Sequence, residues 1–161
     1  IVYSDNNAKD LVVQNLTDEN YRSVFNDLGI DINKYDRFDA PSDFMSAKEY
    51  ASFYRILYNA TYLNKDMSEK ALGLLLKTVF AEGLLSGIPK DIEVSNKFGE
   101  RTFAYTNLKE LHDCGIVYKP DNPYLICIMT KGIDFYSMKK VISDVSKIVY
   151  TELSSQDNIQ N

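Results

Sequence analysis

Apolar side chains recur at the spacing of amphipathic helices along most of residues 1–90. The pattern predicts four helices, over residues 6–15, 17–28, 46–62 and 68–80. Thr17 is a typical N-cap for the second helix, and Gly29 is a suitable residue to end it. Ser46 and Glu49 have the spacing of a capping box, which marks the start of the third helix.

The pattern changes to strands after residue 91. Residues 92–95 alternate between apolar and polar, and residues 110–118 and 124–130 also have strand composition. A turn sequence with two prolines joins the last two strands, so they are expected to form a hairpin. Residues 134–153 carry an apolar stripe at helical spacing and predict a final helix.

These elements predict an α/β chain, more narrowly an α+β fold, with two lobes and a tail. Residues 1–90 are expected to form part of an all-helical lobe. Residues 91–153 are expected to form an antiparallel sheet lobe covered by the C-terminal helix, and residues 154–161 a flexible tail. Because three strands make a narrow sheet with exposed edges, further strands are expected upstream of Ile1, so the fold is predicted to be incomplete at the N-terminus.

Composition excludes several classes of protein. The chain has 161 residues, of which 45% are hydrophobic and 25% charged, so a disordered chain is not expected. A net charge of −5 argues against a nucleic-acid partner. The apolar runs are far shorter than the roughly 20 residues of a membrane span. One histidine and two cysteines without metal-ligand spacing predict no metal site, and no other cofactor is implied.

The two cysteines and the histidine fall within the predicted hairpin. Cys114 and Cys127 are equally distant from its centre and should face each other in a simple antiparallel register. The favoured interpretation is two buried free thiols, and the alternative is a cross-strand disulfide formed in an oxidising compartment. His112 alternates with Cys114, so a packed structural role is favoured over that of a general base.

Two short motifs carry the candidate chemistry. Ser4-Asp5-Asn6 stands before the first helix, and Lys97-Phe98-Gly99 follows the first predicted strand. Each motif alone is ordinary, the first as a helix N-cap and the second as a strand exit. Their order, with a helical segment between them and a hairpin and helix after them, resembles the penicillin-recognising serine hydrolases. This superfamily includes the class A β-lactamases and the penicillin-binding D,D-peptidases.

The resemblance implies a role for each matching residue. Ser4 would pass a proton to the leaving nitrogen, and Lys97 would supply positive charge to Ser4 and to the substrate carboxylate. Asn6 would hydrogen-bond the amide side chain of the substrate. Gly99 would let the substrate backbone lie close to the strand.

The nucleophile of the family motif Ser-x-x-Lys has no match before Ser4. The segment Ser137-Met138-Lys139-Lys140 has this spacing, but it lies in the final helix and is expected on a solvated face. We therefore expect the nucleophile on an N-terminal portion of the same protein, and we do not expect this chain alone to form an acyl-enzyme.

Two further residues depart from the family pattern. Phe98 stands where the family has a Thr or Ser hydroxyl that donates to the substrate carboxylate, so specificity is altered or penicillin-like activity is lost; alternatively, the ring fills part of the cleft or core. Asp39 occupies a loop position similar to that of the deacylating Glu of class A β-lactamases, but its side chain is one methylene shorter. Slow acylation or peptidase-like chemistry is therefore favoured over efficient β-lactamase activity.

The sequence thus supports one main hypothesis and two alternatives. The main hypothesis is a portion of a β-lactamase-like serine hydrolase that acts on β-lactams or peptidoglycan peptides through an acyl-serine intermediate. The first alternative is a non-catalytic descendant that binds peptide or cell-wall fragments, and the second is an autonomous interaction domain. The resemblance also implies a bacterial protein located outside the cytoplasm, in the periplasm or secreted.

Overall fold

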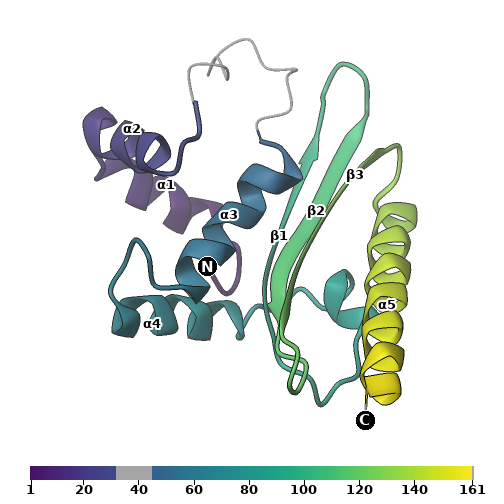
Figure 1. Cartoon of the computed structure of the whole chain (residues 1–161). Coiled ribbons are helices and arrows are strands. Elements are labelled where there is room, and N and C mark those ends of the chain that lie inside the picture. The colour runs from purple at the N-terminus through teal and green to yellow at the C-terminus, as the bar shows by residue number, and fades with distance from the viewer. Residues whose placement is uncertain (32–44, 161) are drawn as a thin grey trace.

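The structure is a computed structural model and describes residues 1–31 and 45–160. Helices α1 to α4 lie on one side of a three-stranded sheet, whereas the 3₁₀ helix η2 and helix α5 lie on the other (Figure 1). This is the predicted α+β arrangement of a helical lobe and a sheet lobe. The elements are α1 Asn6–Gln14, α2 Asp18–Asp27, α3 Ala47–Tyr58, α4 Lys65–Leu75, η2 Leu84–Gly87, β1 Val94–Thr102, β2 Lys109–Val117, β3 Tyr124–Gly132 and α5 Phe135–Gln160.

Local capping sequences set the starts of the helices, as predicted. The Thr17 side chain accepts a hydrogen bond from the Asn20 amide at the start of α2. Ser46 and Glu49 form the reciprocal capping box at the start of α3. Gly29 follows α2 with a φ of 69°, a left-handed conformation that glycine adopts at little cost.

Element boundaries differ from the predictions where tertiary contacts decide them. Strand β1 continues to Thr102 because its pairing with β2 extends through polar residues that broke the apolar alternation. Helix α4 begins at Lys65, capped by Asn64, and ends at Leu75 rather than near residue 80. Helix α5 continues to Gln160 and so includes most of the predicted tail.

The sheet has the order β1-β2-β3 with antiparallel pairing throughout. The β2–β3 register pairs Cys114 with Cys127, as the position of the hairpin centre predicted. The two residues form a disulfide across the strands. The interpretation as two free thiols is therefore wrong, because this register brings the two sulfur atoms together.

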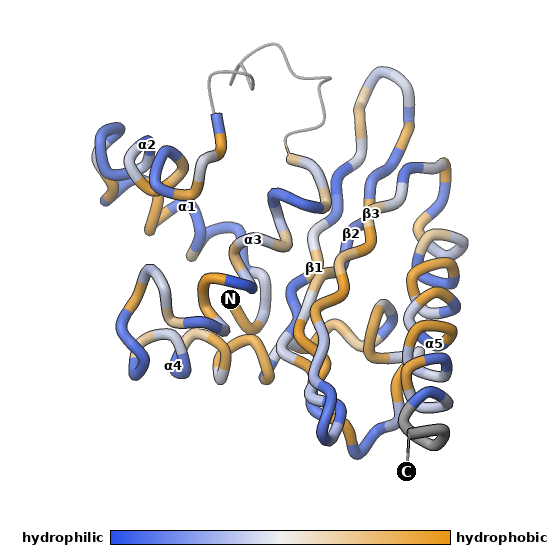
Figure 2. The backbone as a smooth tube through the Cα atoms, in the orientation of Figure 1, coloured by the Kyte–Doolittle hydropathy of each residue, from blue (hydrophilic) through white to orange (hydrophobic). Residues whose placement is uncertain are grey.

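Both faces of the sheet are covered by apolar side chains. Figure 2 shows hydrophobic residues along the middle strand β2 and in η2 and α5. Leu111 and Val117 of β2, Leu84 of η2 and Ile142 of α5 are fully buried on the α5 side. On the other side, Tyr54, Leu72, Leu75, Cys114 and Ile116 form a second cluster between the sheet, α3 and α4. Among the helices of residues 1–31 and 45–160, none is long and apolar enough to cross a membrane.

Loss of the Cys114–Cys127 disulfide is expected to lower the free energy of unfolding by about 2–3 kcal/mol, because the bond closes a short loop in the unfolded chain. The measurement is urea unfolding of the oxidised protein and of the Cys114→Ser/Cys127→Ser double variant. A reductant should destabilise the first protein and leave the double variant unchanged. Alkylation of two thiols in the native, unreduced protein would contradict the assignment.

Candidate functional site

Ser4 and Lys97 meet although they are 93 residues apart in the chain. The Lys97 Nζ donates a hydrogen bond to the Ser4 Oγ at 2.6 Å. Ser4 precedes Asp5, the N-cap of α1, and has a φ of 53°. This left-handed conformation is costly for residues other than glycine and is found disproportionately at functional sites. The two motifs noticed in the sequence therefore form one polar contact between the helical lobe and the sheet.

Lys97 lies inside β1 rather than at its end, and its ammonium is half-buried. Its Nζ also donates to the Phe98 carbonyl oxygen at 2.7 Å and lies 4.5 Å from the centre of the Phe98 ring. Burial lowers the pKa of Lys97, and the Asp113 carboxylate opposes this shift. A lysine with a lowered pKa, hydrogen-bonded to a serine hydroxyl, is suited to proton transfer.

Phe98 packs into the structure instead of projecting freely into solvent. Its ring stacks on that of Phe80, with 4.0 Å between centroids and 18° between planes. It also packs against the apolar cluster between the sheet and α5. Of the alternatives left open by the sequence, this contact favours the one in which the ring fills part of the core. No hydroxyl donor stands at this position beside Lys97.

Gly99 lies opposite His112 in the β1–β2 register. The half-buried His112 ring contacts the Tyr50 ring of α3 edge-on at a centroid distance of 5.0 Å. Burial and the Lys97 charge lower the pKa of His112, whereas Glu110 raises it. The packed role favoured by the sequence agrees with these contacts.

The remaining predicted site residues are Asn6 and Asp39. Asn6 is exposed as the first residue of α1, two positions after Ser4. Asp39 lies outside the described residues, so its predicted role in deacylation stays a prediction.

Sequence reasoning missed a buried polar network beside Lys97. Asp113 is fully buried and accepts hydrogen bonds from the Leu84 amide at 2.9 Å and from the Asn96 Nδ2 at 3.0 Å. The Asn96 Oδ1 in turn accepts from the Thr78 hydroxyl at 2.7 Å. A signal was present, since an aspartate within an apolar middle strand must find partners when buried.

Burial raises the pKa of Asp113 to about 6, although its hydrogen bonds and Lys97 act in the opposite direction. The folded protein therefore holds this proton more tightly than the unfolded chain does, and its stabilising contribution is complete only below the unfolded pKa, near 4.

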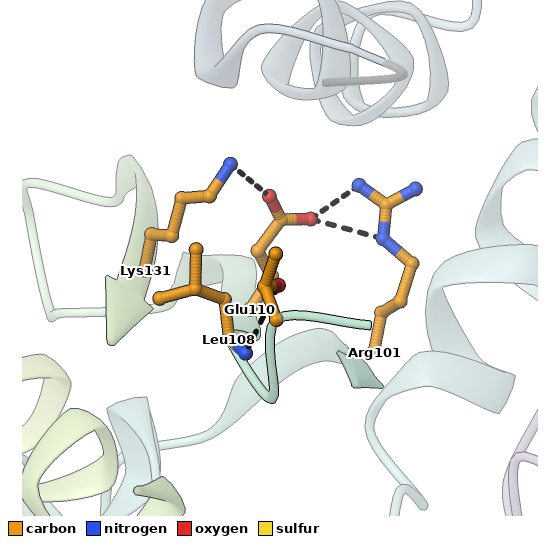
Figure 3. Close-up of polar contacts among 5 residues, drawn as sticks. Arg101, Leu108, Glu110 and Lys131 are labelled. Carbon is orange, nitrogen blue, oxygen red and sulfur yellow. Dashed lines mark hydrogen bonds and ion pairs between the residues drawn. The ribbon is translucent and has the colours of Figure 1, made fainter. Parts of the chain in front are cut away.

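A groove of about 700 Å³ opens beside Gly99, between α3 and the sheet. At its rim the Glu110 carboxylate lies between Arg101, which donates from Nε at 3.1 Å, and Lys131, whose Nζ is 3.0 Å away (Figure 3). One residue from each strand contributes to this ion-pair cluster, so it links side chains of all three strands. Met45, Ser46, Glu49, Tyr50, Leu111, His112, Met129 and Thr130 also line the groove.

The buried Asp113 predicts a pH-dependent stability. The free energy of unfolding is expected to fall by up to about 3 kcal/mol as pH rises from 4 through 6, because the folded state loses the proton that it binds more tightly. Unfolding of the protein and of Asp113→Asn across this range should show a smaller decline in the variant. Carbon NMR of the Asp113 carboxyl should give an apparent pKa near 6; an ordinary value near 4 would contradict this prediction.

The sequence and the fold were compared with known proteins. Residues 1–153 match the model of the beta-lactamase enzyme family, Beta-lactamase2. The search of curated proteins found no match.

The similar solved structures include β-lactamases and a protein named PBP-A. PBP-A superposes with a TM-score of 0.72 at 17% identity, over 96% of this chain and 58% of its own. A class A β-lactamase representing the last common ancestor of Gram-negative bacteria superposes with a TM-score of 0.78 at 22% identity, over 95% of this chain and 62% of its own. A β-lactamase from Sphaerobacter thermophilus superposes with a TM-score of 0.65 at 18% identity, over 89% of this chain and 56% of its own.

At these identities the structural likeness shows the fold alone, and this chain spans about three fifths of the length of those proteins. The family match is independent of that likeness and extends over nearly the whole chain, including Ser4, Lys97 and the strands and helices that bring them together. The chain belongs to the beta-lactamase enzyme family.

Proposed function

We propose that this chain supplies the serine–lysine proton-transfer pair of a β-lactamase-like serine hydrolase. The observation that carries the proposal is the 2.6 Å hydrogen bond from the Lys97 Nζ to the Ser4 Oγ. It joins the two motifs that the family uses, across 93 residues of chain, and membership of the beta-lactamase enzyme family supports this interpretation.

The proposed reaction begins with a serine on an N-terminal portion of the protein. Its oxygen bonds to the carbonyl carbon of a β-lactam or a peptide amide, the C–N bond breaks, and the proton of the attacking serine passes to a base beside it. Ser4 gives its hydroxyl proton to the leaving nitrogen, and the Lys97 ammonium restores that proton through their hydrogen bond. The proton that the base took from the attacking serine then returns to Lys97. Water then releases the acyl group, and Asp39 is the residue that we propose to activate it.

The remaining residues are proposed to bind substrate. Asn6, exposed near Ser4, is proposed to hydrogen-bond an amide side chain of the substrate, and Gly99, which lines the groove between α3 and the sheet, is proposed to let a substrate backbone lie along β1. The proposed substrates are β-lactams or peptidoglycan peptides, and one similar structure supports the first of them, a PBP-A variant in an acyl-enzyme complex with penicillin G. A location outside the cytoplasm is supported by the Cys114–Cys127 disulfide, since such bonds persist in oxidising compartments.

One observation favours the alternative, a non-catalytic protein that binds peptide or cell-wall fragments. Phe98 stacks on Phe80 where the family has a hydroxyl that donates to the substrate carboxylate. A hydrogen bond to a charged group contributes about 1.5–3 kcal/mol, so its absence weakens carboxylate recognition. Weak binding without acylation is the outcome that this alternative predicts.

Replacement of Ser4 or Lys97 is expected to slow acylation strongly. In a protein that contains the proposed N-terminal portion, a fluorescent penicillin should acylate the variants Ser4→Ala and Lys97→Met about 10²–10⁴-fold more slowly than the unsubstituted protein. Each substitution removes one step of the proton path. Gel fluorescence over time measures the rate.

The matched control for Lys97 is Lys140→Met. Lys140 is an exposed lysine of α5 that pairs with Asp144, and its replacement should leave the acylation rate unchanged. Equal rates for Lys97→Met and Lys140→Met would overturn the proposed role of Lys97. Reversible binding of the penicillin with no adduct on any residue would favour the non-catalytic alternative.

Replacement of Phe98 by Thr is expected to tighten the binding of carboxylate-bearing β-lactams by about tenfold or more, since it restores a hydroxyl donor beside Lys97. The measurement is the apparent Kd for penicillin G and for its methyl ester, which lacks the charge. The gain should be confined to the free acid. Phe98→Val, which removes the ring without adding a hydroxyl, is the control, and an equal gain in Phe98→Val would contradict the prediction.

A further inference from the structure

At Gly99, the side of β1 on which the His112 ring lies has no room for a side chain. A Cβ atom added to Gly99 would lie 2.5 Å from the Nε2 of His112, closer than such contacts occur in proteins. Gly99 does not have a positive φ, so its backbone alone does not require glycine. The constraint therefore comes from the His112 ring, which occupies the space of the missing side chain.

The His112 ring also contacts the helical lobe. It lies edge-on to the Tyr50 ring of α3 at 5.0 Å, and Tyr50 itself packs beside Tyr54 against the cluster that contains the disulfide. A continuous contact therefore runs from α3 through His112 to the backbone of β1. Lys97 stands two residues before Gly99 on this strand, and its ammonium contacts Ser4 of the helical lobe.

The charges around His112 favour an uncharged ring. Burial and the nearby Lys97 ammonium lower the pKa of His112, and Glu110 acts in the opposite direction. A neutral imidazole can pack under β1 beside Lys97 without repelling it, whereas an imidazolium would carry a second positive charge.

We propose that His112 is a positioning residue, whose ring replaces the side chain at residue 99 and holds the Lys97–Gly99 segment of β1 at a fixed position relative to α3. The packing part of the proposal stands on the geometry alone. The catalytic consequence rests on the proposed function, because it assumes that Lys97 and Ser4 transfer protons.

A double-mutant cycle tests the packing. Gly99→Ala should lower the Tm by about 3–10 °C, because the new methyl group strikes the ring. In the His112→Ala background the same substitution should cost less than half as much, since the ring that it strikes is gone. Additive effects of the two substitutions on Tm would overturn the proposal.

Two other glycines of the sheet are matched controls. Gly132→Ala should change the Tm little, because its Cβ would meet only the flexible Met138 side chain at 3.5 Å. Gly115→Ala should lower the Tm with or without His112, because its Cβ would lie 2.7 Å from the backbone oxygen of Ser95. If His112→Ala also reduced the loss of Tm caused by Gly115→Ala, its effect would not be specific to residue 99, and the proposal would be overturned.

Acylation and amide exchange separate positioning from simple packing. In a protein that contains the proposed N-terminal portion, Gly99→Ala should slow acylation by fluorescent penicillin about tenfold or more, and Gly99→Ala/His112→Ala should recover part of that loss. In the conservative variant His112→Phe, which retains a ring, the amide hydrogens of Gly99 and Glu100 should exchange with solvent as slowly as in the unsubstituted protein. In His112→Ala they should exchange faster. Unchanged acylation in Gly99→Ala would overturn the positioning role.

Failure of the proposed function gives a different result. If neither the unsubstituted protein nor any variant is acylated, the hydrolase proposal fails. The double-mutant cycle in Tm and the amide exchange still test whether His112 positions the Lys97–Gly99 segment. Non-additive Tm values together with faster exchange in His112→Ala support the positioning role in that case. Unchanged exchange in His112→Ala overturns it.

Discussion

The pairing of β1 with β2 is the constraint on which the rest of the structure depends. In this register Lys97, Gly99 and their partners on β2 face the helical lobe, whereas Phe98 and Asp113 face η2 and α5. Because side chains alternate along a strand, a slip of one residue would move each of them to the opposite face. The Lys97–Ser4 hydrogen bond and the His112 packing require this register, whereas the disulfide requires the adjoining β2–β3 register.

A buried polar network attaches the segment that connects the two lobes to the sheet. Asp113 binds the Leu84 amide, and Asn96 links Asp113 to Thr78, so both ends of the segment between α4 and η2 are tied to the sheet. Breaking such a network leaves buried groups without partners, which costs more than the hydrogen bonds themselves contribute. The same segment carries Phe80, and its fixed position accounts for the stacking on Phe98.

The candidate site therefore combines a hydrogen-bonded serine–lysine pair with an aromatic neighbour. Ser4 and Lys97 form the pair that is proposed to transfer protons, and burial lowers the pKa of Lys97. The aromatic ring next to Lys97 replaces a polar group with an apolar one. Substrate recognition, rather than proton transfer, is where this chain is proposed to differ from penicillin-recognising relatives.

Features of the chain that depend on neighbours in sequence could be predicted from the sequence itself. The N-caps at Thr17 and Ser46, the hairpin pairing of Cys114 with Cys127 and the two-lobe order of elements all follow from patterns a few residues long. The candidate pair Ser4 and Lys97 was also identified from the sequence, by the order of two motifs that resemble those of a known family.

Contacts between distant segments decided the rest. The extension of β1 to Thr102 depends on β2, and the disulfide depends on the distance between two sulfur atoms, which no local pattern contains. Asp113 is an ordinary acid in the sequence and acquires a raised pKa only where the fold buries it beside Leu84 and Asn96. His112 and Gly99 become a matched pair for the same reason: a sequence specifies volumes and charges one residue at a time, and only the packed structure decides which of them occupy the same space.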